Sequence, residues 1–408
     1  MSAQTHSLPV RRLARYQFFI VLLLVLIAVV RPSWGVLALG AASATWPLRR
    51  LSCGRWNERT ALDWAVLALA ATVPVGLWMS ADRALSLVEA GRLLLGVGLM
   101  YALVNSVAVG LPLWPAAALV IGGGAGLALL GLIGGVPPAG QVLPLPALPR
   151  LLPWPLDMHA NVLATALAMS LPLAAAFALW QEPVGRPRWT RWAAAAATAV
   201  IPVGLLFTQS RGAFLGLAAA GLVMVVLRWR WLALPALGLA AAGALGLRLA
   251  GEPLVPLLTA GIPGREEVWL RGLAAVEDFP LTGIGLGLFG RLVPILYPFY
   301  TLGAGPAVQP NHAHNLYLQV ATDLGLPGLV ALIAVLLAAA ALLGRSWRSG
   351  EAALRPLAWG LAGSLTAVAV HGLVDAVAWS SRVSVLLWLI LGLVVALPQP
   401  SVQQVNVK

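Results

Sequence analysis

Long apolar segments, separated by short polar stretches, run through the whole sequence and limit the folds that it can adopt. Hydrophobic residues make up 60% of the 408 residues, whereas charged residues make up only 10%. So few charges cannot cover the surface of a soluble fold of this size. The composition therefore excludes a soluble globular enzyme and predicts an all-α polytopic membrane protein.

About twelve segments are expected to be transmembrane helices. They lie near residues 17–30, 33–47, 61–80, 87–109, 111–135, 159–180, 192–209, 212–228, 231–250, 314–344, 357–379 and 383–397. The tenth segment is expected to break at Pro327. The first follows three arginines, as a signal peptide would, but no small-residue cleavage site comes after it, so a retained helix is expected. Residues 1–408 are expected to form a single integral membrane domain.

The placement of basic residues predicts the orientation of these helices. The chain has 26 Lys and Arg against 14 Asp and Glu, and a cytoplasmic N-terminus places 16 of the 26 in cytoplasmic loops. This follows the bias that sets membrane orientation, and an even number of helices then puts both termini in the cytoplasm. The arginines form no basic stripe, so nucleic acid is not implied as a partner.

Under this orientation the two longest loops, about 136–158 and 251–313, lie outside the cytoplasm. The first is rich in proline and is expected to extend over the bundle. The second is the expected catalytic loop, between spans nine and ten, and its apolar periodicity from Glu266 to Phe279 predicts a helix at the membrane surface. Function is therefore to be sought on this side.

The sequence Asn-His-Ala-His-Asn at residues 311–315 closes the second loop and opens the tenth span. Histidine is the side chain best suited to take a proton near neutral pH, and a helix N-terminus disfavours its charged form. These residues therefore predict a neutral general base. The alternative is a polar cap for a membrane helix, exposed at the interface.

An arginine at a helix start on this side predicts an anion site. Arg211 is expected to begin a helix whose free amides also attract anions, so both could hold a phosphate. Arg265 begins the expected surface helix, with Arg271 on another of its faces. The alternative for Arg211 is an interfacial side chain that reaches lipid headgroups. Glu266 and Glu267 are interpreted as first-turn residues that favour the helix dipole.

Other polar motifs are interpreted as structural. Gly283, Gly285 and Gly287 resemble a phosphate loop, but no strand precedes them and no Lys-Ser/Thr follows, so a nucleotide site is rejected. The spacings of Glu89 with Arg92, and of His371 with Asp375, favour structural pairs on one helix face, with a cavity lining as the alternative. No Asp-x-Asp pair occurs and Cys53 is the one cysteine, so no metal or other cofactor is expected.

The motifs on this side resemble those of the O-antigen ligase and polymerase superfamily of membrane glycosyltransferases. The resemblance rests on Ser-Arg-Gly at 210–212, Gly-Arg at 264–265 with Trp269, Pro280 and the glycines of 283–287, and His-Asn-Leu-x-Leu-Gln at 314–319 with Gly325 and Gly328. It covers residues 205–345 well. The N-terminal half is similar only as a series of membrane helices.

The resemblance implies transfer, with inversion, of a glycan from undecaprenyl pyrophosphate to an acceptor hydroxyl on the outer face of the bacterial inner membrane. It implies His314 as the catalytic base and Arg211 and Arg265 as pyrophosphate ligands. Supporting candidates are Asn315, His312, Arg291, Arg271, Arg382 and Tyr317.

Three functions remain open at this stage. A ligase would use a lipid A-core acceptor, and the compact His-Asn motif and large second loop favour it. A polymerase of O-antigen or exopolysaccharide would use a second lipid-linked glycan as acceptor. A transporter or flippase would place charges near the midplane of several helices, which the sequence does not do. The oligomeric state is left open.

Overall fold

The chain folds into helices that span a bilayer several times. The computed structural model describes residues 8–139, 143–146, 148–151, 158–180, 187–232, 262–298, 311–348 and 354–398, with a few single residues between 234 and 246. Every regular element in these residues is helical. Six helices are long and apolar enough to cross a membrane: α5 (Arg83–Ala108), α6 (Trp114–Ile133), α7 (Ala160–Leu179), α8 (Trp189–Thr208), α9 (Arg211–Arg228) and α14 (Leu316–Arg348).

Shorter helices complete the bundle. Three of them are apolar over 10 to 17 residues: the Ala14–Val30 part of α1 (Leu8–Val30), α4 (Asp63–Met79) and α17 (Ser384–Val395). The remaining α-helices are α2 (Gly35–Ser43), α3 (Thr45–Cys53), α12 (Ile262–Asp278), α13 (Phe289–Leu296), α15 (Arg355–His371) and α16 (Val377–Ser380). The prediction of a multi-pass all-α membrane protein is confirmed.

The expected span at 33–47 is interrupted at Ala44, where α2 ends and α3 begins, but Ala44 keeps helical backbone angles, so this span stays a prediction. One of the twelve expected spans is wrong in detail. Residues 357–379 are not one helix, because α15 ends at His371 and turns lead to the single turn of α16. The expected span at 231–250 lies largely outside the described residues, so the count of twelve stays a prediction.

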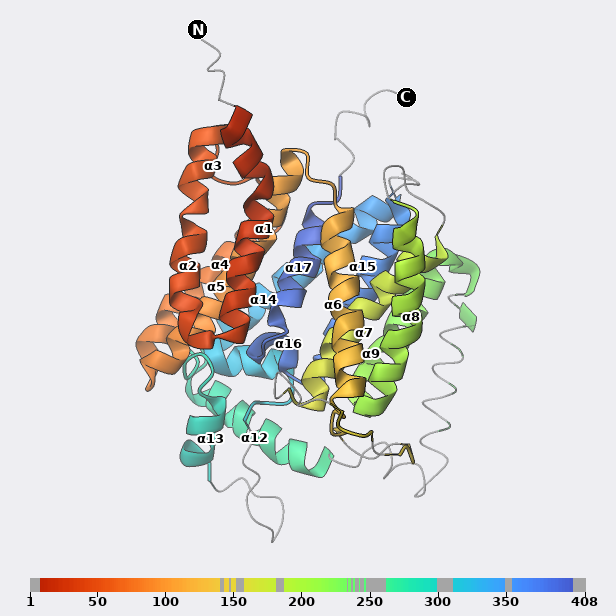
Figure 1. Ribbon diagram of the computed structural model, residues 1–408. Coiled ribbons are helices and arrows are strands. Elements are labelled where there is room, and N and C mark those ends of the chain that lie inside the picture. The colour runs from red at the N-terminus through yellow and green to blue at the C-terminus, as the bar shows by residue number, and fades with distance from the viewer. Residues whose placement is uncertain are drawn as a thin grey trace.

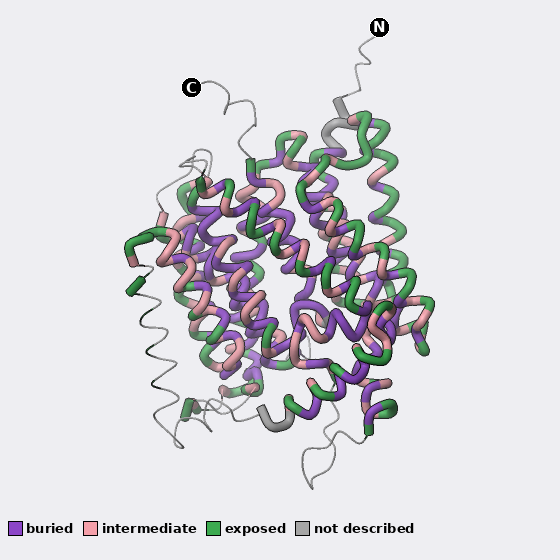
Figure 2. Tube along the Cα trace, turned by 180° about the vertical axis from the view of Figure 1, so that it is seen from behind, coloured by how far each residue is buried: buried purple, intermediate pink, exposed green. Residues whose placement is uncertain are grey.

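Small residues allow the central helices to approach closely. The α7 helix, rich in alanine and buried along most of its length, packs against α8 and α15, and α15 packs against α9. A Cβ atom at Gly216 of α9 would lie 2.5 Å from the carbonyl oxygen of Ala367 in α15. Lipid tails are as apolar as the side chains, so membrane helices associate mainly through close van der Waals packing, which small residues allow. Figure 2 shows the buried residues concentrated inside this bundle.

The start of α1 and the end of α17 lie at one end of the bundle, and α12 and α13 cover the other (Figure 1). The expected surface helix at 266–279 is therefore present as α12, which begins slightly earlier. Its Val268 and Ala275 pack against Phe289 and Ala313. The end that carries the second long loop is thus the end opposite both termini.

The α14 helix is broken near its start. The expected break at Pro327 lies at Gly325, whose φ of 72° and ψ of −178° are not helical. Residues 280–288, which we call the glycine turn, lie against this break: the Ile284 amide donates to the Thr322 carbonyl at 2.8 Å and the Leu326 amide to that of Pro280 at 2.7 Å. A Cβ at Gly283 would lie 2.6 Å from the Asp323 carbonyl carbon, so only glycine allows this approach. The structure thus gives the glycine pattern a packing function.

Candidate active site

The two histidines lie in a tight loop that leads into α14. His314 has φ 49°, in the left-handed region that residues other than glycine rarely occupy. Three contacts hold the loop: the His314 amide donates to His312 Nδ1 at 3.2 Å, the Ala313 amide to Gln319 Oε1 at 2.8 Å, and Trp269 Nε1 to the His314 carbonyl at 3.4 Å. The last contact ties α12 to the loop. Backbone strain held by several contacts is typical of functional sites.

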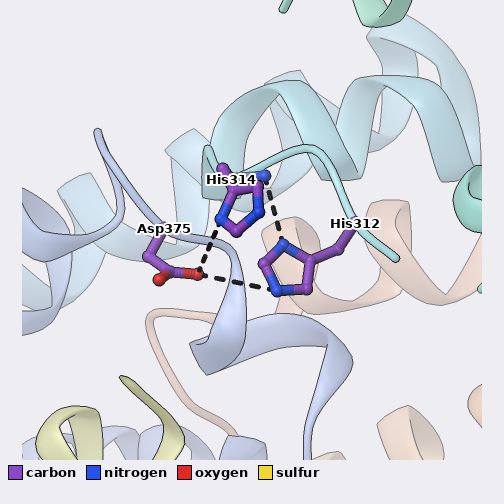
Figure 3. Close-up of side chains that lie close together, drawn as sticks. All are labelled: His312, His314 and Asp375. Atoms are coloured by element: carbon purple, nitrogen blue, oxygen red, sulfur yellow. Dashed lines mark hydrogen bonds and ion pairs between the residues drawn. The ribbon is translucent and has the colours of Figure 1, made fainter. Parts of the chain in front are cut away.

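Asp375 lies beside both imidazole rings (Figure 3). One of its oxygens, Oδ1, is 3.9 Å from His312 Nε2 and 3.9 Å from His314 Nδ1, and the two ring centroids are 4.2 Å apart. The Asp375 side chain is only 2% exposed. Its Oδ2 accepts a hydrogen bond of 2.7 Å from Asn161 Nδ2 on α7, and its Oδ1 accepts one from the Ala376 amide. We call His312, His314 and Asp375 the His–Asp cluster.

Hydrogen bonds define which ring nitrogens carry protons. His312 Nδ1 accepts from a backbone amide, so the proton of the neutral His312 ring is on Nε2, facing Asp375. The nitrogen of His314 that faces Asp375 is Nδ1. A proton there interacts with the carboxylate and leaves the lone pair of His314 on Nε2, as a general base requires.

Burial keeps the histidines neutral. It lowers the pKa of His314 to about 4; the neighbouring charges of His312 and Arg265 act in the same direction, and the Asp375 carboxylate opposes them. Burial also lowers the pKa of His312. Both rings are therefore neutral at pH 7. The charge of Arg265, at the start of α12, contributes to the lowering of both pKa values.

The cluster has the residue types of a metal site but not the protonation of one. His312, His314 and Asp375 offer ligand atoms that all lie within 4.8 Å of one another. A cation would need the lone pair of His312 Nε2, the nitrogen that carries the proton while Nδ1 accepts from the His314 amide. Binding of a cation at His312 Nε2 would therefore cost the hydrogen bond that Nδ1 accepts.

Arg211 begins α9 at the same end of the bundle. It follows Gln209, the other non-glycine residue with positive φ among the described residues (53°). The next residue, Gly212, packs against His371 at the end of α15, where a Cβ would lie 2.7 Å from the imidazole Cδ2. His371 Nδ1 is in turn 3.2 Å from Thr165 Oγ1 on α7. The structure therefore gathers the starts of α7, α9 and α14 and the end of α15 around the His–Asp cluster.

The supporting candidates lie in different surroundings. Arg271 is 1% exposed and forms an ion pair with Glu267 on its own helix. Arg291 is exposed and pairs with Asp82, the N-cap of α5, which joins α13 to the bundle. Tyr317 donates to the Ala369 carbonyl at 2.9 Å. These polar groups hold the surrounding helices together.

Asn315 and Arg382 complete the set. Asn315 caps α14 by accepting from the Leu318 amide at 2.9 Å, and its Nδ2 donates to the Leu373 carbonyl at 3.0 Å. Arg382 is partly exposed between α16 and α17. Asn315 thus provides the helix cap that was the alternative interpretation of the motif, while its histidine neighbours face Asp375.

Sequence reasoning missed two residues of the site. Asp375 was interpreted as half of a structural pair with His371, and Asn161 was not singled out. The available signal was the position of Asp375, a carboxylate near the same membrane face as the His motif. The apolar pattern predicts one continuous helix at 357–379, so it does not reveal the turn after His371 that directs Asp375 toward the histidines.

Comparison with known proteins adds an independent observation. Residues 193–333 match the O-antigen ligase family. The matched O-antigen ligase region runs from α8 into α14 and contains Arg211, Arg265, His312 and His314. It indicates a membrane glycan transferase of the ligase and polymerase family. Asn161 and Asp375 lie outside the matched region. No curated protein matches the chain.

Proposed function

We propose that the protein is an inverting glycosyltransferase that moves a glycan from undecaprenyl pyrophosphate to an acceptor hydroxyl. The observation that supports this most directly is the His–Asp cluster, with a neutral His314 beside a buried carboxylate at the start of α14. The match of residues 193–333 to O-antigen ligase supports the same class of reaction. The site faces the periplasm of a bacterial inner membrane, with both termini in the cytoplasm.

His314 acts as the general base. Its Nε2 accepts the proton of the acceptor hydroxyl as the hydroxyl oxygen attacks the anomeric carbon of the donor glycan. The bond from that carbon to the pyrophosphate oxygen breaks, and undecaprenyl pyrophosphate leaves with the electron pair. Asp375 stabilises the imidazolium as it forms, because its carboxylate raises the pKa of His314 against the effect of burial.

Arg211 and Arg265 bind the pyrophosphate. A guanidinium group donates two parallel hydrogen bonds to phosphate oxygens and stays charged throughout the reaction. The free amides at the start of α9 add to the attraction for an anion beside Arg211. Two such groups neutralise the charge that develops on the leaving group, so we propose that transfer needs no metal ion.

The proposed acceptor is lipid A-core, which makes the protein an O-antigen ligase. The second long loop carries α12 and α13 across the end of the bundle, and Trp269 of α12 contacts the His314 carbonyl. We assign acceptor binding to this loop because loops on a rigid scaffold carry specificity.

The test is a transfer assay with purified protein in liposomes, given an undecaprenyl-pyrophosphate glycan and lipid A-core, without any ion gradient. We expect transfer by the parent and a loss on the order of 10²-fold or more in His314→Ala, Arg211→Ala and Arg265→Ala. Arg345→Ala, an exposed arginine at the opposite end of α14, is the matched control and should keep the parental rate. Parental rates in all three folded variants would refute the proposed site, and translocation without transfer would refute the function.

Omitting lipid A-core from the assay distinguishes a ligase from a polymerase. The same liposomes receive only the lipid-linked glycan, with no lipid A-core. A ligase gives no product under these conditions, whereas a ladder of lengthened lipid-linked glycans would show that the acceptor proposed here is wrong.

A further inference from the structure

Asp323 is a buried carboxylate in the first part of α14, just before the helix breaks at Gly325. Its side chain is 1% exposed, and it accepts three hydrogen bonds. Oδ1 accepts from Gln319 Nε2 at 2.9 Å and from the Gly287 amide at 3.3 Å, and Oδ2 accepts from Trp379 Nε1 at 3.0 Å. Gln319 lies one turn earlier in α14, whereas Trp379 belongs to α16 and Gly287 to the glycine turn, and each donor leads to a different segment of the candidate active site.

The first segment, the loop that carries the two histidines, is reached through Gln319 of α14. Because Gln319 donates its amide nitrogen to Asp323, its amide oxygen points the other way and accepts from the Ala313 amide at 2.8 Å. Ala313 lies between His312 and His314 and is itself fully buried. Asp323 therefore fixes the orientation of the Gln319 amide, and the amide fixes the loop at its central residue.

The second segment carries Asp375. Trp379 lies in the short helix α16, which begins two residues after Asp375, and its backbone amide donates to the Ala376 carbonyl at 3.0 Å. A four-residue helix has too few internal hydrogen bonds to hold its own place. The bond from Trp379 Nε1 to Asp323 attaches this helix to α14, so it also limits where Asp375 can lie.

The third segment is the glycine turn, which connects α12 to α13. Gly287 donates to Asp323 from the end of this turn, while the amide of Ile284 donates to the carbonyl of Thr322. The turn fixes the end of α12, whose Trp269 contacts the His314 carbonyl and whose first turn carries Arg265. Asp323 thus contacts the glycine turn and α16 directly and reaches the histidine loop through Gln319.

We propose that Asp323 is a positioning residue that holds His312 and His314 against Asp375 without contacting substrate. Its effect on glycan transfer rests on the proposed function, but its effect on the histidines does not. A carboxylate suits this position because it has two acceptor oxygens and no donor. An asparagine has one acceptor oxygen and one NH₂ group. Its NH₂ group would point toward either Trp379 Nε1 or Gln319 Nε2, and two donors would then face each other with no acceptor between them.

The test compares Asp323→Asn, Trp379→Phe and the double variant with the parent and a matched control. The control is Asp63→Asn, because Asp63 also accepts three hydrogen bonds, two from Thr60 and one from Tyr101. Asp63 is the first residue of α4, whereas the other end of α4 leads to Ser80 beside the glycine turn. We expect Asp323→Asn to lower kcat about 10- to 100-fold with little change in the donor KM, since misplacement of about 1 Å costs up to about 10²-fold. Where the asparagine NH₂ group faces Trp379 Nε1, the double variant removes the opposing indole donor and should recover part of the loss.

A second measurement does not depend on glycan transfer. The rate at which diethyl pyrocarbonate modifies His312 and His314 is followed by mass spectrometry as a function of pH. We expect the midpoint of this profile to shift in Asp323→Asn, to shift less in Trp379→Phe, and to stay at the parental value in Asp63→Asn. Thermal unfolding in detergent accompanies each variant.

The outcomes are separable. A folded Asp323→Asn with parental kcat and a parental histidine profile would overturn the proposal, and so would an equal shift in Asp63→Asn, because the effect would then be general. If Asp323→Asn does not fold, Trp379→Phe alone decides through the same profile. A parent protein without transfer activity, in which the histidine profile still responds to Asp323→Asn, would refute the proposed function and support the positioning.

Discussion

Replacing Asp375 with asparagine tests the catalytic geometry directly. The carboxylate oxygen lies 3.9 Å from His314 Nδ1, and at that distance the attraction between unit charges is about 1 kcal/mol in water and about 4 kcal/mol at an effective dielectric constant near 20. His314 is 30% exposed, so the value lies within this range rather than above it. If the proton is about half transferred in the transition state, the loss is about 0.5 to 2 kcal/mol, or about a 2- to 30-fold drop in kcat.

The pH profile gives the sign of the effect. Because burial lowers the pKa of His314 to about 4, the base is neutral above that pH and the acidic limb of kcat should have its midpoint near pH 4. The carboxylate raises this pKa, so Asp375→Asn should move the limb to lower pH while the plateau falls. Asp278→Asn, which removes the acceptor of a bond from Tyr297 outside the cluster, is the control. A folded Asp375→Asn enzyme with an unchanged plateau, or with its limb moved to higher pH, would refute the reasoning.

Three further predictions concern other parts of the site. Arg265→Lys should lose on the order of 10²-fold in kcat/KM, because an ammonium group cannot make paired bonds to phosphate. Arg265→Met should move the acidic limb of the pH profile to higher pH, because this arginine lowers the pKa of His314. A fully active lysine variant or an unmoved limb would contradict these expectations. Gly283→Ala should lower Tm by several degrees or prevent folding, since its Cβ would lie 2.6 Å from Asp323, whereas Gly122→Ala, with no atom within 4 Å, should melt like the parent. Transfer should continue in excess EDTA, and a rate that falls with chelator and returns with magnesium would disprove metal independence.

The transmembrane helices were predictable because a bilayer imposes a length and an apolar composition on each of them. The common face of the candidate residues was predictable as well, since alternation of crossing helices places every second loop on the same side. The sequence pattern alone predicts Arg211, Arg265 and His314 at one end of the bundle, and the starts of α9, α12 and α14 lie there. Whether they perform the proposed functions stays a prediction.

The parts that sequence reasoning missed depend on contacts between distant residues. Asp375 is bound by Asn161, and Asp323 by Trp379 and Gly287, and no local periodicity reveals such pairs. The end of α15 at His371 depends on such contacts as well. The apolar run continues past His371, so the sequence pattern alone predicts a longer helix. The break in α14 was placed two residues late, at Pro327, because proline is the local signal for a kink whereas the backbone actually departs at Gly325.

The interruption of α14 divides that helix into two parts that face different selective pressures. After Gly325 the helix packs apolar residues such as Leu332, Val335 and Ala339 inside the bundle, and its length suits the bilayer. The two turns above Gly325 share backbone hydrogen bonds with residues 280–288, so changes in either must suit the other. An engineer who grafts this outer loop from another transferase therefore has to move residues 311–325 with it, because the recipient's own first turns would not accept a foreign partner.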